Sequence, residues 1–417
     1  MTNRLFGTAK LLSGVFKASI LSFIAIFAFA IYDFVLPLFV EGESDNFAIV
    51  GIIISLVYVA SLLSEVPIGL AVDRYGRIRM LITAMSALGA LGILYFFSNG
   101  AIQLAVLSLL AGVISVAFWV PSTVLVRDFS PRKMLAQSEG VYLTITQLGW
   151  IAGPMIAGIV STQFSDKHNF LIFTFLMFTA VGAAFLIFRG KDVKRFRKME
   201  KEHEHQSRIK LLMLSFVKYM KLHKHATPLY ALSLIAYMWI SLEWAFIALT
   251  GIKTFGFSET VVGVLVGAMM AIEGMLYLTS GYLMDKVGTK YIITSGFFLL
   301  FASSYFIFLA QTPAAFLFAV LMAAGATSWI LPGTESLLTK IVPANMMGEM
   351  TSVFDTSKDF GLIIGPLVGG LIANQFGNPQ AAFGMIFVSA GAACLFSGYI
   401  FWPDKSYKKG RTAATTN

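Results

Sequence analysis

Six acidic residues lie inside long apolar stretches of this sequence, where a carboxylate is costly and usually has a role. They are Asp33, Glu65, Glu243, Glu273, Glu335 and Asp359, and a single base, Lys358, lies among them. Burial disfavours the charged form of a carboxylate, so such groups can take up and release protons near neutral pH. The excess of acids over bases favours protons or cationic compounds, rather than anions, as ligands.

Three of these acids are the strongest candidates for binding a proton or a cation. Asp33 lies in the first apolar stretch and is the first candidate. Glu273 precedes Asp285 by twelve residues, which places it about 18 Å along a helix at 1.5 Å per residue. Asp359 lies at a similar depth within the eleventh predicted span. Its neighbour Lys358 can either take part in coupling or simply pair with a nearby acid.

The other acids have different expected roles. Glu65 and Glu335 lie closer to the ends of their stretches, and we expect them to contribute to a gate. Glu243 is flanked by Trp239 and Trp244, so it could meet an aromatic cation through cation–π contact. Aromatic residues also serve lipid contact and interfacial belts, and that alternative stays open. The aromatic candidates are Tyr32, Trp119, Trp150, Trp239 and Trp329.

The composition indicates a membrane protein. The chain of 417 residues is 57% hydrophobic and only 13% charged, about half the charged fraction of soluble domains. Its mean hydropathy is +0.77. Stretches near 20 apolar residues can each cross a bilayer as a helix. Twelve such stretches are predicted, at about 18–40, 47–71, 79–98, 101–125, 138–162, 169–189, 228–251, 260–283, 290–310, 314–338, 350–374 and 380–402.

The sequence repeats itself with a shift of 212 residues. Gly69, Asp73, Arg74, Gly76 and Arg77 correspond to Gly281, Asp285, Lys286, Gly288 and, one residue out of step, Lys290. Gly149, Gly153, Pro154 and Gly158 correspond to Gly361, Gly365, Pro366 and Gly370. Six predicted spans fall in each copy. A long repeat in an apolar chain predicts an all-α membrane protein with two pseudo-symmetric six-helix bundles, an arrangement typical of transporters.

The repeat divides the chain into four parts. We predict a first bundle over 1–190, a linker over 191–227, a second bundle over 228–403 and a tail over 404–417. Part of the linker, around 209–218, could form an amphipathic helix on the membrane surface that binds anionic lipid headgroups. Its histidines lack metal-ligand spacing, so neither a metal nor a cofactor is expected. Cys394 is the sole cysteine, which excludes an intrachain disulfide.

The positive charges predict the orientation. All but three of the 31 Lys and Arg residues lie on the side of the termini; the exceptions are Lys167, Lys253 and Lys358. By the positive-inside rule both termini are cytoplasmic, in a multi-pass protein of the plasma (cell inner) membrane. This bias explains the net charge of +9, so no nucleic-acid partner is expected. We expect a monomer whose partners are membrane lipids, a small-molecule substrate and protons.

Two motifs resemble those of the major facilitator superfamily. The segment from Gly69 to Arg79 is similar to the family's loop signature between spans two and three, and a weaker copy falls between spans eight and nine. The segment Gly149–Gly158 resembles the Gly-Pro motif associated with antiporters. The acid and proline of Tyr32-Asp33-Phe34-Val35-Leu36-Pro37 follow a pattern seen in drug/proton antiporters. The resemblance covers essentially the whole chain and implies the major facilitator fold.

The resemblance also implies roles for the repeated motifs. The loop signature would latch the two halves on the cytoplasmic side, with Asp73 pairing with Arg74 or Arg77; positive charges also anchor topology in any case. Gly69 and Gly76 would allow close approach of backbones. The latch in the second copy should be weaker. The Gly-Pro segments would bend at Pro154 and Pro366 and so control closure at the outer side, or pack closely through small residues; the two roles are not exclusive.

One feature departs from the antiporter pattern. Such proteins usually carry an arginine in span four, and the corresponding position here is Ser108. Either Arg127 or Lys358 supplies the positive partner, or coupling differs.

The sequence favours a secondary transporter over other classes. It has no phosphate-binding GxxxxGK[ST] loop, and an enzyme is not expected. We expect proton-coupled efflux of amphipathic or cationic molecules by alternating access, as in multidrug transporters. A lipid or glycolipid flippase, or a metabolite carrier, of the same superfamily is the alternative. A non-transporting receptor or scaffold would not need acids near the midplane.

Overall fold

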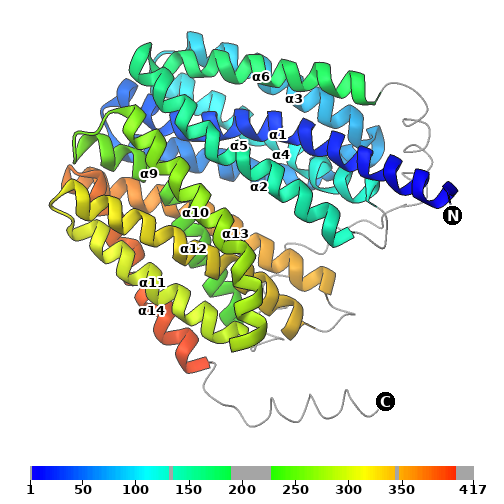
Figure 1. The fold of residues 1–417 in the computed structure, drawn as a ribbon. Coiled ribbons are helices and arrows are strands. Elements are labelled where there is room, and N and C mark those ends of the chain that lie inside the picture. Colours follow the sequence, from blue (N-terminus) through cyan, green and yellow to red (C-terminus); the bar gives the residue numbers. More distant parts are fainter. Residues whose placement is uncertain (1, 131–134, 189–226, 343–346, 401–417) are drawn as a thin grey trace, which may run out of the picture.

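The predicted membrane spans are confirmed as helices. The computed structural model describes residues 2–130, 135–188, 227–342 and 347–400 (Figure 1). Twelve helices of this part of the chain are long and apolar enough to cross a membrane. They are α1 (Thr2–Ser44), α2 (Phe47–Tyr75), α3 (Arg77–Phe97), α4 (Ala101–Phe129), α5 (Leu135–Gln163), α6 (Asp166–Ile187), α9 (Thr227–Lys253), α10 (Glu259–Val287), α11 (Thr289–Leu309), α12 (Pro313–Ile341), α13 (Met347–Phe376) and α14 (Phe383–Ile400), with a short 3₁₀ helix at Pro379–Ala382.

Polar and glycine residues mark where the helices begin and end. The Asn46 side chain accepts the backbone N–H groups of Ala48 and Ile49, at 2.9 and 3.2 Å, and so caps α2. Gly76, with φ of 92°, makes the one-residue turn between α2 and α3. Gly288, with φ of 109°, does the same between α10 and α11. Because this φ range is readily open only to glycine, both copies of the loop signature need glycine there.

The helices form two bundles that correspond to the two copies of the repeat. Helices α1–α6 form the upper bundle in Figure 1 and α9–α14 the lower one. The main contacts between bundles are α5 with α10 and α2 with α13. The bundles converge where α2 and α10 begin and diverge where these helices end (Figure 1). We call these the closed end and the open end. The linker and the tail lie outside the described residues.

Two glycine crossings hold the bundles together at the closed end. A methyl group on Gly51 of α2 would lie 3.0 Å from the Cα atom of Gly370 on α13. A methyl group on Gly263 of α10 would lie 3.2 Å from the Cα atom of Gly158 on α5. The crossings are related by the 212-residue shift, since 51 corresponds to 263 and 158 to 370. Small residues are therefore required where the two helix pairs touch.

The remaining glycines of the Gly-Pro motifs pack within their own bundles. A methyl group on Gly149 would lie 3.0 Å from the backbone nitrogen of Phe27 on α1, and one on Gly361 would lie 3.0 Å from that of Met238 on α9. Gly153 and Gly365 likewise face α1 and α9. Close packing by these motifs is confirmed, both within and between bundles. A bend at the prolines stays a prediction.

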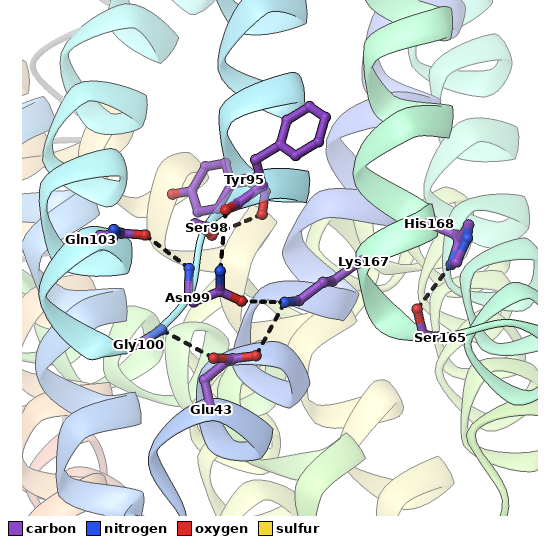
Figure 2. Close-up of polar contacts among 10 residues, drawn as sticks. Glu43, Tyr95, Ser98, Asn99, Gly100, Gln103, Ser165, Lys167 and His168 are labelled. Atoms are coloured by element: carbon purple, nitrogen blue, oxygen red, sulfur yellow. Dashed lines mark hydrogen bonds and ion pairs between the residues drawn. The ribbon is translucent and has the colours of Figure 1, made fainter.

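Charged residues reinforce the closed end. Lys253 Nζ at the end of α9 lies 2.7 Å from Glu41 Oε2 near the end of α1, and this ion pair joins the two bundles. Within the first bundle, Lys167 Nζ lies 3.4 Å from Glu43 Oε1 and donates to Asn99 Oδ1 at 2.7 Å. Figure 2 shows this second network, in which the Gly100 N–H also donates to Glu43 at 3.0 Å. Two of the three bases that break the charge bias therefore pair with acids at the closed end.

Candidate functional site

A cavity of about 320 Å³ lies between the bundles and contains the first candidate acid. Most of its lining belongs to α1, α2 and α4 of the first bundle. The second bundle contributes fewer residues. They are Trp244, Ala245, Asp359 and Leu362. A pocket formed by both repeats is the usual place for a transporter site.

Asp33 lies in the wall of this cavity on α1. Tyr32, Tyr58 and Pro37 line the same cavity. The neighbouring wall is apolar, so a carboxylate here is little shielded by water and interacts strongly with a charge that enters. Asp33 is thus placed where it can bind a proton or the positive end of a ligand.

A chain of hydroxyl groups fixes the wall beside Asp33. The hydroxyl groups of Tyr32 and Tyr95 lie 3.0 Å apart, and that of Tyr95 lies 3.0 Å from Ser108 Oγ. Tyr95 and Ser108 are fully buried. Ser108 occupies the position where an arginine was expected from the resemblance. In this protein that position contributes a neutral hydrogen bond to the tyrosine chain.

Aromatic rings form much of the cavity wall. The ring centroids of Phe29 and Trp119 lie 5.3 Å apart, and both residues line the cavity. Trp244 faces it from the second bundle and contacts Trp150 of the first, with centroids 5.3 Å apart. These aromatic side chains give the cavity a largely apolar lining, which suits a hydrophobic cation.

Two further acids reach the cavity from opposite bundles. Glu65 of α2 and Asp359 of α13 both line it. Lys358 Nζ pairs with Glu335 and lies 3.1 Å from Asp355 Oδ1, 4.4 Å from the ring centroid of Phe354. Of the two alternatives for Lys358, pairing with nearby acids is observed, and a part in coupling stays a prediction. Asp359 lies beside this pair on the cavity wall.

Glu243 and Glu273 lie together in the interior of the second bundle and are not part of the cavity lining. They are 3% and 5% exposed, and their carboxyl groups are within hydrogen-bonding reach of each other. Trp239 donates to Thr327 Oγ1 beside them at 2.9 Å. Successive helical residues point about 100° apart, which is why Trp244 faces the cavity and Glu243 does not. Glu243 therefore does not line this cavity, and its contact with an aromatic cation stays a prediction.

The loop signatures lie at the open end with their charges exposed. Asp73 and Arg74 are exposed, and the Arg74 guanidinium lies 5.5 Å from the ring centroid of Tyr75. A methyl group on Gly69 or Gly281 would meet no described atom within 4 Å. The close approach expected at Gly69 therefore does not occur while the bundles diverge there. The latch itself stays a prediction.

The second copy of the signature differs in its contacts. Asp285 and Lys286 are exposed, and Lys286 Nζ lies 5.7 Å from the ring centroid of Tyr282. Thr289, where the first copy has Arg77, accepts a hydrogen bond from Lys340 of α12 at 2.6 Å. Arg127 belongs to α4, and its side chain lies outside the described part of the structure.

Sequence reasoning missed several residues of the site. Tyr58 and Ser61 line the cavity from α2, and no pattern in the sequence distinguishes them from other residues of an apolar span. Gly51 and Gly263 could have been found, because they share the 212-residue shift with the other repeated glycines.

The sequence is similar to those of known membrane transporters. A model of the Major Facilitator Superfamily matches residues 18–252 and 229–416. The multidrug resistance protein MdtG of Escherichia coli is 24% identical over 403 residues, covering 94% of this chain and 93% of MdtG. An uncharacterized MFS-type transporter of Methanocaldococcus jannaschii is 23% identical over 329 residues, covering 79% of this chain and 83% of the relative.

Solved structures share the fold at low sequence identity. The nucleoside transporter NupG, as a D323A mutant, is 13% identical, with a TM-score of 0.79 and coverage of 93% of this chain and 100% of NupG. An inward-facing bacterial homologue of the iron transporter ferroportin is 12% identical, with a TM-score of 0.73 and coverage of 93% and 98%. Twelve spans, the two-bundle architecture and the family match agree, and the chain belongs to the major facilitator superfamily.

Proposed function

We propose that this protein exports amphipathic cations across the cell membrane in exchange for protons, by alternating access. The observation that carries the proposal is the position of Asp33, a carboxylate in an aromatic cavity between the two bundles. A lipophilic cation would place its charge near Asp33 and its apolar surface against Phe29, Trp119 and Trp244. The name of MdtG, a multidrug resistance protein, supports this choice of substrate class.

The orientation of the two ends in the membrane is inferred from the charge bias. With the positive segments in the cytoplasm, the open end faces the cytoplasm and the closed end faces outside. The structure then corresponds to an inward-open state that can load substrate from the cytoplasm or the inner leaflet. Release outside would require the glycine crossings to separate and the loop signatures to approach each other.

Proton exchange at Asp33 would give coupling in its simplest form. A proton and a cation compete for one carboxylate, because the protonated group no longer attracts a positive charge. A proton taken up from outside would displace the cation, and its release to the cytoplasm would allow the next cation to bind. Glu273 and Asp359 are the other acids proposed to take part.

The test is proton flux in proteoliposomes on addition of tetraphenylphosphonium or ethidium. Substrate-induced flux is expected in the wild type and not in Asp33→Asn. The matched control is Asp45→Asn, because Asp45 is exposed in the turn after α1 and its φ of 47° also suits asparagine. Flux retained in Asp33→Asn would contradict the role of that residue. No flux in the wild type would contradict cation efflux and favour the lipid or metabolite carrier.

A further inference from the structure

The second bundle contains a pair of acids that the cavity does not use. Glu243 of α9 and Glu273 of α10 lie side by side in its interior. Glu243 Oε2 and Glu273 Oε1 are buried without a hydrogen-bond partner among the described atoms. Buried polar groups normally have partners, so each unsatisfied oxygen marks a place where a further hydrogen can bind.

Among the residues that the structure describes, no base compensates the charge of this pair. The groups that contact it directly are neutral: Trp239 of α9 and Thr327 of α12. The titratable group that interacts with both acids is Tyr277 on α10, which also interacts with Tyr237 on α9. Two adjacent carboxylates in such a site cannot both be ionised. At least one proton must therefore be held by the pair, and a second can be accepted.

The pair also has a polar connection to the open end. Tyr277 lies one helical turn from Glu273 in that direction and interacts electrostatically with both acids and with Tyr237. The ring centroid of Tyr237 lies 5.3 Å from Lys358 Nζ, which is paired with Asp355 and Glu335. Tyr237 and Tyr277, which both carry hydroxyl groups, thus connect the Lys358 cluster with the buried acids through electrostatic interactions.

We propose that Glu243 and Glu273 form a proton-binding site separate from the cavity, so that the proton binds inside the second bundle and the substrate binds in the cavity between the bundles. The pair takes one proton onto a carboxylate oxygen and changes from one negative charge to none. The identity of the substrate rests on the proposed function. The acid pair, in place of Asp33, then carries the proton that is exchanged for the substrate. Asp33 then acts as the binding group for the cation.

The first experiment tests the pair without any substrate. Infrared difference spectra of the reconstituted protein between alkaline and acidic buffer report the carbonyl stretch of carboxyl groups that become protonated. The wild type is expected to show a band that is lost in both Glu243→Gln and Glu273→Gln, because each glutamine keeps the size of the side chain and removes the acid. Asp33→Asn and the control Glu259→Gln, at the closed end of α10, should keep this band. A band that persists in both glutamine variants would overturn the proposal.

The second experiment separates the proton from the substrate. Tetraphenylphosphonium binding at equilibrium is expected to persist in Glu273→Gln, whereas accumulation driven by a pH gradient is lost. Asp33→Asn should lose binding. Loss of binding in Glu273→Gln would overturn the separation of the two sites. If the wild type binds no tetraphenylphosphonium, the proposed function fails, and the infrared band still decides whether the pair is a proton site.

Discussion

The two bundles share a scaffold and differ in where they place their acids. In the first, Asp33 faces the cavity and a neutral chain of Tyr32, Tyr95 and Ser108 lies behind it. In the second, Glu243 and Glu273 lie behind the cavity wall. By the 212-residue shift, position 33 corresponds to Ala245 and position 273 to Ser61, so neither acid has an acidic counterpart. The repeat therefore conserves the contacts between helices, while the chemistry differs between copies.

At the closed end, the two copies of the repeat use equivalent positions for their contacts. Its two glycine crossings occupy equivalent positions, and so do the two partners of its ion pair, since Glu41 corresponds to Lys253. The ends of α1 and α9 thus meet across the pseudo-twofold axis with opposite charges. Experiments on this end test whether the two halves contribute equally to closure.

The largest effect is expected at the glycine crossings. Gly158→Ala and Gly370→Ala each place a methyl group against the backbone of the opposite bundle, so each should separate the bundles at the closed end, and by similar amounts. The measurement is the distance between spin labels at Gln103→Cys and Gln311→Cys in a Cys394→Ser background. Gly140→Ala is the matched control, since its methyl group on the same helix α5 would meet no described atom within 4 Å. A change in only one of the two variants would contradict the symmetry.

A smaller effect is expected at the ion pair between bundles. Lys253→Glu places a second negative charge beside the buried carboxylate of Glu41. It should destabilise the closed arrangement of this end, relative to the open one, by about 2 kcal/mol. The charge-swapped double variant Glu41→Lys/Lys253→Glu should restore the spin-label distance, because the two positions are equivalent. Lys167→Met removes an ion pair within one bundle and should leave that distance unchanged. Failure of the swap would show that the ends of α1 and α9 are not interchangeable.

The smallest effects are expected from single buried hydrogen bonds behind the cavity. Tyr95→Phe removes the links to Tyr32 and Ser108, and Trp239→Phe removes the bond to Thr327. Each should lower the stability of its bundle by about 1 kcal/mol for each hydrogen bond lost, and the lost ring volume of buried Trp239 should add to the effect of Trp239→Phe. Thermal unfolding of the purified protein measures both. Trp239→Phe should in addition change the infrared band of the acid pair, whereas Tyr95→Phe should leave that band unchanged. The same effect of both variants on the band would contradict the difference between the acidic interior of the second bundle and the neutral hydroxyl chain of the first.

Much of the architecture could be predicted from the sequence. A membrane requires each span to be a long apolar helix with its backbone hydrogen bonds satisfied internally, so hydropathy alone located the twelve helices. The repeated glycines predicted two related bundles. The one-residue turns at Gly76 and Gly288 follow from local sequence because only glycine readily adopts their φ angles.

The placement of the acids was harder to predict. All six were identified as residues in apolar spans, because charge in such a span is rare. Their partners depend on helix rotation and on which helices pack together. A rotation of about 100° separates Trp244, in the cavity wall, from its neighbour Glu243, in the interior of the second bundle.

The sequence by itself determined the spans, the repeat and the presence of costly acids, because each of these is a property of residue type and order. Only the tertiary structure decided that Asp33 faces the cavity, that Lys358 pairs with Asp355 and Glu335, and that Glu243 meets Glu273. These outcomes depend on contacts between helices far apart in the chain. In an apolar environment the hydrophobic pattern that orients helices in water is weak, so packing of small residues sets the rotation of each helix and with it the direction of every acid.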